Sequence, residues 1–138
     1  ETEPFARSAY EVAKDILVEQ VGFIHHPAID GSGASPDGLL GLFGLVEIKC
    51  PNTATHIQTL LDQKDPEKYN IQMQWQMACT QRQWCDFVSF DPRMAEGLQL
   101  FIKRVEFDPV LVASLEKEVI FFLEELEEKI IQLNKLKV

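Results

Sequence analysis

Two acidic residues and a lysine stand close together in the segment SPDGLLGLFGLVEIKCP, which is otherwise rich in apolar residues. Asp37 follows a proline, and Glu47, ten residues later, precedes Lys49 by two positions. Two carboxylates that lie close together repel each other unless a cation stands between them. A hard divalent cation such as Mg²⁺ is commonly held by one or two carboxylates and keeps other positions for water and a substrate phosphate. The pattern predicts a Mg²⁺ site, which Mn²⁺ can also fill, with Asp37 and Glu47 as ligands.

Lys49 adds a positively charged side chain to this predicted site. Side chains alternate across a strand, so Glu47 and Lys49 are expected on one face and Val46 and Ile48 on the other, toward the core. Lys49 would then place a compact positive charge beside the metal, suited to orienting the attacking water and stabilising a phosphorane-like transition state. The alternative is a solvated face formed by Glu47 and Lys49, with Asp37 as a turn residue only.

A hairpin is needed to bring the two acids together. The segments ASPDGLLGL and GLVEIKCP are predicted as two strands joined around GLFG. Pro51 ends the second strand because proline cannot donate a hydrogen bond to the sheet. If the strands pair, the carboxylate of Asp37 approaches Glu47.

The rest of the chain predicts helices mixed with strands. Apolar spacing indicates a helix from Pro4 to Gln20, and Asp108 with Pro109 indicates the N-cap and first position of a long C-terminal helix. Between them we expect a short strand in VGFIHHPAI with a turn at GSG, a helical or irregular connection over 52–69, a helix over 70–81, and strands in WCDFVSFDP and LQLFIKRVEF. This order predicts an α/β or α+β domain.

Length, composition and charge limit the classes to which the protein can belong. The 138 residues, 46% of them hydrophobic, suffice for one domain with a single core, residues 1–138. The net charge of −9 and the pI near 4.7 argue against a large basic surface for nucleic acid, so any contact with a polyanion must be local. The three cysteines form no CxxC pair, which favours a reducing, cytoplasmic setting. No apolar run reaches the ~20 residues of a membrane span, and no signal peptide is recognisable.

Three segments together resemble a known family: SPDG, EIKCP and YNIQMQWQMACTQRQWCDFVSFDPRM. They are similar to the PD-(D/E)xK nucleases, and among these to the phage lambda exonuclease branch, the YqaJ-like viral recombinases. The resemblance runs from EPFARSAYE into the C-terminal helix and implies a restriction-endonuclease-like core, a central mixed β-sheet flanked by helices. It also implies Mg²⁺-dependent 5′-to-3′ digestion of one strand of linear double-stranded DNA. The implied partners are DNA ends, two further copies in a ring-shaped homotrimer, and a single-strand annealing protein that uses the 3′ overhang, all from a phage or prophage in a bacterial host.

Site residues carry over position by position. The resemblance makes Asp37 and Glu47 the metal-binding acids, the carbonyl of Ile48 a further metal ligand, and Lys49 the catalytic lysine. Alternative outcomes are an endonuclease of the same fold, or a DNA-binding or assembly module without activity; the intact set of Asp37, Glu47 and Lys49 argues against the module.

Two more residues match the family pattern, and each has a plainer interpretation. Glu3 matches an acid on the first helix just before an Ala-Arg pair, although any acid is favoured in the first turn of a helix. Gln72 matches a glutamine near the scissile phosphate, although it also belongs to an ordinary packed helix.

Other positions are weaker candidates. The family segment upstream of the first helix, which helps bind the 5′-terminal phosphate, has no counterpart in this sequence. Asp30 only loosely matches an additional family acid, and Arg93 in DPRM is expected either to contact phosphate or to pair with Asp91. Cys50 is predicted as a core thiol. We expect surface or loop roles rather than zinc ligation for the three histidines, which are His25, His26 and His56.

Overall fold

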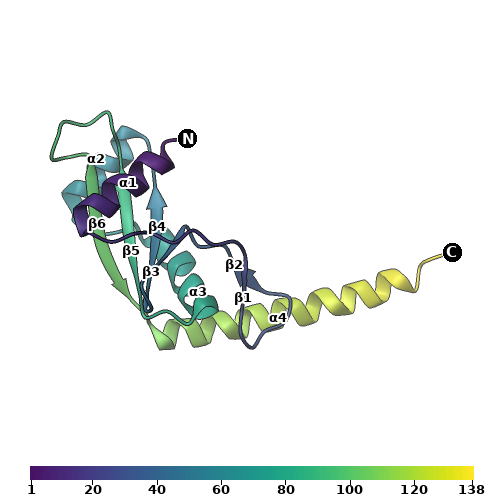
Figure 1. The fold of residues 1–138 in the computed structure, drawn as a ribbon. Helices are drawn as coiled ribbons and strands as arrows, with labels where there is room; N and C mark the ends of the chain where they lie inside the picture. The colour runs from purple at the N-terminus through teal and green to yellow at the C-terminus, as the bar shows by residue number, and fades with distance from the viewer.

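The computed structural model describes residues 1–138, in which four α-helices and one short 3₁₀ helix accompany six strands. In chain order these are α1 (Glu3–Lys14), β1 (Ile24–His25), β2 (Gly33–Ala34), β3 (Gly38–Leu40), β4 (Gly44–Lys49), α2 (Thr53–Asp62), η1 (Glu67–Tyr69), α3 (Asn70–Thr80), β5 (Trp84–Phe90), β6 (Leu100–Glu106) and α4 (Pro109–Asn134). The mixed α/β fold predicted from the sequence is confirmed (Figure 1).

The central sheet has the strand order β3-β4-β5-β6. The pairs β3–β4 and β5–β6 are antiparallel, whereas β4 and β5 run parallel, with Glu47 opposite Phe87 and Lys49 opposite Ser89. A parallel pair requires a crossover connection, which α2, η1 and α3 supply. The predicted hairpin of β3 and β4 is therefore present, and the carboxyl ends of β4 and β5 lie side by side.

Helices cover both faces of the sheet. On one face, Ala6 and Tyr10 of α1 pack against Val46 and Ile48 of β4. On the other face, the α3 side, the buried cluster is Leu45, Met73, Met77, Cys85, Phe87 and Phe101. Strand β4 is consequently buried on both sides, as is usual for strands in a covered sheet.

The first helix is shorter than its apolar spacing predicted. It ends at Lys14 rather than Gln20, because Asp15 adopts a left-handed conformation (φ 52°) and its N–H returns to the carbonyl of Glu11. Beyond this break Ile16, which continues the apolar spacing, packs against the same core, whereas Leu17, which the predicted helix also included, is 82% exposed.

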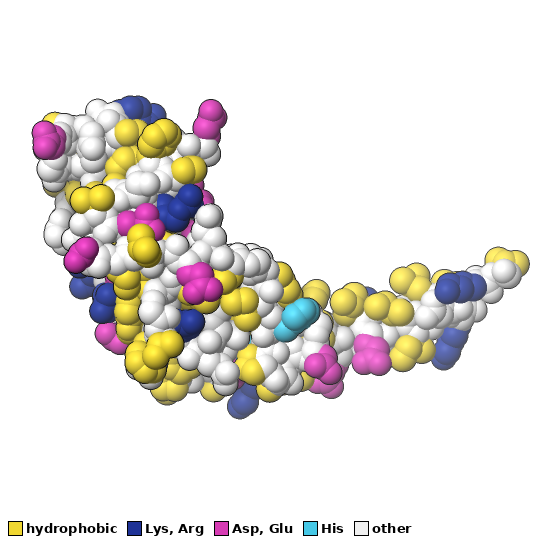
Figure 2. Space-filling view, in the orientation of Figure 1, with side chains coloured by type: hydrophobic (Ala, Val, Ile, Leu, Met, Phe, Trp, Pro, Cys, Tyr) yellow, Lys and Arg dark blue, Asp and Glu magenta, His cyan; other side chains and the backbone are white.

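The last helix extends beyond the body of the domain. Asp108 caps it as predicted, since its side chain accepts a hydrogen bond from the N–H of Leu111, and Pro109 occupies the first turn. After Leu123 every residue of the chain is exposed, and Figure 1 shows this half of α4 projecting away from the sheet. Figure 2 shows hydrophobic side chains along the projection, with acidic and basic ones between them. No helix of the structure, α4 included, is long and apolar enough to cross a membrane.

Candidate active site at the end of strand β4

Asp37 and Glu47 meet at one end of the β3–β4 hairpin. Asp37 immediately precedes β3, and its Oδ2 accepts a hydrogen bond of 2.7 Å from the N–H of Ile48. This bond fixes the carboxylate beside the β4 backbone, next to the residue whose carbonyl is predicted as a metal ligand. Glu47 itself is only 2% exposed, which excludes the solvated-face alternative for this side chain.

Burial changes the acid-base behaviour of Glu47. The loss of solvent, followed by the hydrogen bond and the negative charge of Asp37, raises the pKa of Glu47 to about 8, although Lys49 and Gln76 act in the opposite direction. The two carboxyl groups are therefore close enough to share one site, and without a cation they favour a proton on Glu47.

The ammonium of Lys49 contacts two groups, the carboxylate of Glu47 and the ring of Tyr69. Its Nζ atom lies 3.7 Å from Glu47 Oε2 and 4.6 Å from the centre of the Tyr69 ring. Tyr69 is stacked on Phe87, with ring centres 5.8 Å apart, and Lys68 approaches the Tyr69 ring to 5.0 Å. The aromatic platform and the buried carboxylate together restrict where the ammonium of Lys49 can lie.

Two contacts of this site were missed from the sequence. Gln76 donates from Nε2 to Glu47 Oε2 at 3.4 Å, whereas the pattern indicated only a packed helix position. The sequence pattern places Tyr69 at the end of the connection over 52–69 and gives it no role in the site. The available signal was the spacing Tyr69-x-x-Gln72-x-x-x-Gln76, which places the two glutamines on one side of α3.

The predicted residues Gln72 and Glu3 are less enclosed. Gln72 is exposed on α3, one turn before Gln76, and makes no hydrogen bond with its side chain. Glu3 lies in the first turn of α1, and Arg7 approaches it to 3.9 Å. Both remain predictions as site residues.

The position of Cys50 corrects one prediction and places Glu3 near the site. Cys50 is exposed rather than a core thiol, because it follows the end of β4, where the sheet is no longer covered. Partial burial raises the pKa of the Cys50 thiol, and the carboxylates of Glu3, Asp37 and Asp91 raise it further. The start of α1 therefore lies on the same side of the molecule as the acid pair.

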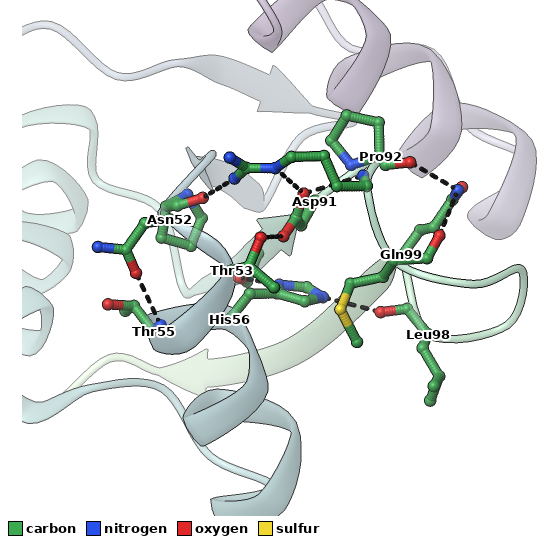
Figure 3. A network of polar contacts seen from close by, with 12 residues as sticks. Asn52, Thr53, Thr55, His56, Asp91, Pro92, Leu98 and Gln99 are labelled. Atoms are coloured by element: carbon green, nitrogen blue, oxygen red, sulfur yellow. Dashed lines mark hydrogen bonds and ion pairs between the residues drawn. The ribbon is translucent and has the colours of Figure 1, made fainter.

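A buried aspartate fixes the DPRM loop after β5 (Figure 3). Asp91 is fully buried; Oδ1 accepts hydrogen bonds from Arg93 Nε at 2.8 Å and Arg93 N at 3.0 Å, and Oδ2 accepts one from Thr53 at 2.6 Å. Burial alone would raise the pKa of Asp91, but the hydrogen bonds from Arg93 and Thr53 outweigh it and lower the pKa to about 2. The predicted pairing of Arg93 with Asp91 is present, and Arg93 Nη2 also donates to the carbonyl of Pro51 at 3.2 Å.

Two of the histidines are interior residues rather than surface ones, which corrects the expectation from the sequence. His56 is fully buried, with Nδ1 2.7 Å from Ser89 Oγ and Nε2 2.8 Å from the carbonyl of Leu98 (Figure 3). His26 is buried, with Nε2 2.5 Å from Glu116 Oε2. Both rings form structural hydrogen bonds, and His25 is exposed as expected.

The donors at the end of β4 fit a hard divalent cation. No group of three or more His, Cys, Asp or Glu side chains is arranged to hold a metal ion, and Asp30 lies in an exposed turn. Two carboxylates are nevertheless a sufficient protein contribution for Mg²⁺, which retains several water molecules. The Oε1 atom of Gln76, beside Glu47, is buried without a hydrogen-bond partner. An acceptor of this kind suits a site that takes a cation with its water shell.

Comparison with known proteins finds one family and several solved structures that are similar to this chain. The YqaJ-like viral recombinase domain matches residues 1–83. The structure of an alkaline exonuclease, LHK-Exo, from Laribacter hongkongensis is 53% identical, covers 97% of this chain and 69% of its own, and superimposes with a TM-score of 0.95. The same protein in complex with dAMP gives 0.94, again at 53% identity, with the same coverage. No curated protein matches the chain.

A more distant structure shares the fold alone. A phage related exonuclease from Haemophilus somnus 129PT is 14% identical, covers 96% of this chain and 70% of its own, and gives a TM-score of 0.76.

Fold and site together define a nuclease with the PD-(D/E)xK type of core, homologous to alkaline exonucleases. The chain belongs to the YqaJ-like viral recombinase family.

Proposed function

We propose that the protein is a Mg²⁺-dependent 5′-to-3′ exonuclease that hydrolyses one strand of linear double-stranded DNA and leaves a 3′ overhang for recombination by strand annealing. The observation that carries the proposal is the buried Glu47 beside Asp37, with the ammonium of Lys49 3.7 Å from Glu47. The relative of known structure that binds dAMP, a deoxynucleotide, supports DNA as the substrate.

In this proposal, Asp37, Glu47 and the carbonyl of Ile48 hold the metal. When bound, the Mg²⁺ ion supplies positive charge that polarises the phosphoryl group and lowers the pKa of the attacking water. The oxygen of that water bonds to phosphorus while the bond from phosphorus to O3′ breaks, and a proton ends on O3′. The ammonium of Lys49 faces the negative charge that develops on the phosphoryl oxygens, where a preorganised charge has its largest effect.

Gln76 and Tyr69 position the groups that react. The hydrogen bond from Gln76 orients the Glu47 carboxylate, and the Tyr69 ring limits the positions open to Lys49. Glu3 and Gln72 are proposed to lie near the phosphate once DNA is bound; Gln72, exposed on α3 between Tyr69 and Gln76, and Glu3, whose charge acts on Cys50, support this. The ring-shaped homotrimer and the annealing partner belong to the same proposal and rest on the resemblance.

Cleavage of linear and closed circular duplex DNA, with and without Mg²⁺, tests the function. We expect loss of the linear duplex only, and only with the metal. Separate labels on the 5′ and 3′ ends establish the polarity, with the 5′ label expected to be released first. Cutting of the closed circle would instead indicate an endonuclease, and an intact linear duplex in Mg²⁺ or Mn²⁺ would reject catalysis.

A further inference from the structure

A small hollow lies just beyond the end of β4. Its volume is about 260 Å³, and its lining residues are Thr2, Cys50, Pro51, Phe90, Pro92 and Arg93. Arg93 is the one cationic side chain in this lining. Cys50 and Pro51 of this lining directly follow Lys49, the last residue of β4, so the hollow continues from the end of the strand that carries the lysine.

The guanidinium of Arg93 is fixed before any ligand arrives. Its Nε donates to Asp91 Oδ1 at 2.8 Å and its Nη2 donates to the Pro51 carbonyl at 3.2 Å (Figure 3). A guanidinium has five N–H groups, so three remain free after these two bonds. A fork that is already held in place loses little conformational freedom when it binds a planar or tetrahedral anion.

Arg93 and its ion-pair partner Asp91 differ in how far their side chains are exposed to solvent. The side chain of Asp91 is fully buried, whereas that of Arg93 is 63% exposed. The negative charge therefore lies behind the arginine, where it also accepts hydrogen bonds from Thr53 and from the N–H of Arg93. Because most of the Arg93 side chain is exposed, its remaining N–H groups are accessible to an anion in solution.

We propose that Arg93 and this hollow bind a backbone phosphate of the cleaved DNA strand, adjacent to the scissile one. The inference rests on the proposed function for the identity of its ligand. It also addresses the charge of the protein, because a chain with a net charge of −9 can bind a polyanion only through a few fixed local cations.

The test compares two arginines at opposite ends of the sheet. Arg93→Gln removes the proposed phosphate contact, and Arg82→Gln is the matched control, since Arg82 likewise donates to backbone carbonyls, those of Gly41 and Gly44. Both are placed in a Lys49→Ala background in Mg²⁺, so that a fluorescent linear duplex is bound but not consumed. The dissociation constant is measured by anisotropy at several salt concentrations.

We expect Arg93→Gln to weaken binding about tenfold and to reduce the slope of log K against log salt by about 0.9, the value for one phosphate contact. Arg82→Gln should leave both quantities unchanged. An Arg93→Gln protein that binds within about twofold of its parent overturns the proposal. So does weaker binding with an unchanged salt slope and a lower melting temperature, since that result indicates a structural role.

A set of duplexes, each with one neutral methylphosphonate linkage, identifies the phosphate itself. One linkage should weaken binding by the parent and have no further effect on Arg93→Gln, because the contact is already lost. If every linkage that affects the parent affects Arg93→Gln equally, the proposal is wrong. Binding is read without cleavage, so the two proposals fail separately: a protein with Lys49 intact that binds the duplex yet never degrades it in Mg²⁺ rejects the exonuclease function, while this test still gives its answer. A parent that binds no duplex rejects the phosphate site.

Discussion

Lys49 is the residue whose role the surroundings define most narrowly. An exposed ion pair with a carboxylate contributes only ~0.2–1 kcal/mol, but Glu47 is buried and the lysine lies between it and an aromatic ring. We expect Lys49→Ala to slow single-turnover cleavage of a 5′-phosphorylated duplex by ~10²–10³, with metal and DNA binding retained.

Lys49→Arg provides the sharper comparison for the same side chain. It keeps the charge but replaces a compact ammonium with a planar fork, so we expect DNA binding to be retained and little of the cleavage rate to be recovered. If Lys49→Ala cuts within about threefold of the parent at saturating Mg²⁺, the lysine is not catalytic.

Tyr69 is predicted to act through Lys49. Tyr69→Leu removes the ring under the ammonium, and a cation–π contact of this kind corresponds to roughly a 2–30-fold change in rate. Tyr69→Phe keeps the ring and should retain the parent rate. In a Lys49→Ala background, Tyr69→Leu should cause no further loss of the cleavage rate. A double-mutant cycle built from single-turnover cleavage rates at saturating Mg²⁺ measures this. Equal losses in both backgrounds would indicate that Tyr69 serves only the packing against Phe87.

Glu47 makes the metal-free protein sensitive to pH. Folding raises the pKa of this carboxyl from 4.5 to about 8, so the folded state holds an extra proton between those values. The stabilising effect is complete below about pH 4.5 and is lost as the pH rises through about 8. We expect Glu47→Gln to unfold at higher urea than the parent at about pH 8 without metal, with a smaller difference at about pH 5.

The exposed Glu96→Gln provides the control for that comparison, since it also removes one acid. Equal stability of Glu47→Gln and the parent at the higher pH would contradict the assignment of a buried, protonated acid. Calorimetric binding of Mg²⁺ or Mn²⁺ should be lost in Glu47→Gln and in Asp37→Asn.

The sequence predicts elements best where the deciding contacts are local. The β3–β4 hairpin and the capped start of α4 follow from turn residues and from Asp108 with Pro109. The end of α1 does not, because Ile16 continues the helical spacing of the sequence but packs against the core from beyond the end of the helix. For the same reason the roles of Gln76 and Tyr69 were missed: their partners, Glu47 and Lys49, lie at least 20 residues away along the chain.

The buried side chain of His26 holds the β1–β2 hairpin in place. The β1–β2 hairpin is attached to α3 and α4 through His26, whose ring stacks on Trp75 at 5.3 Å, bonds to Glu116, and accepts the N–H groups of Ala28 and Ile29 on Nδ1. We expect His26→Ala to lower the free energy of unfolding by about 1–3 kcal/mol. Hydrogen exchange should accelerate over residues 24–34, whereas substitution of the exposed neighbour in His25→Ala should leave both quantities unchanged. Unaltered exchange in His26→Ala would show that other contacts hold the hairpin.

The whole molecule combines an acidic surface with a function on DNA. Eight of its acids fall between Glu106 and Glu128, in or next to α4, away from the end of β4 where Lys49 lies. The other 14 of the 22 acids lie elsewhere in the chain, Asp37 and Glu47 among them, so the site end can contact a polyanion only through local cations such as Lys49 and Arg93. An enzyme of this kind holds DNA most effectively by enclosing it, since short-range contacts then replace a broad basic surface.

Assembly is therefore the prediction that concerns the molecule as a whole. Leu126, Ile130 and Leu133 form an exposed apolar stripe on the projecting half of α4, which suits burial against another chain. We expect light scattering to give about three chains per particle, a closed cyclic assembly. Leu126→Ser combined with Ile130→Ser should lower that mass, while Glu125→Gln on the same turn should not. A parent that stays monomeric and still degrades long duplexes without dissociating would contradict enclosure, because a single chain has no means to surround its substrate.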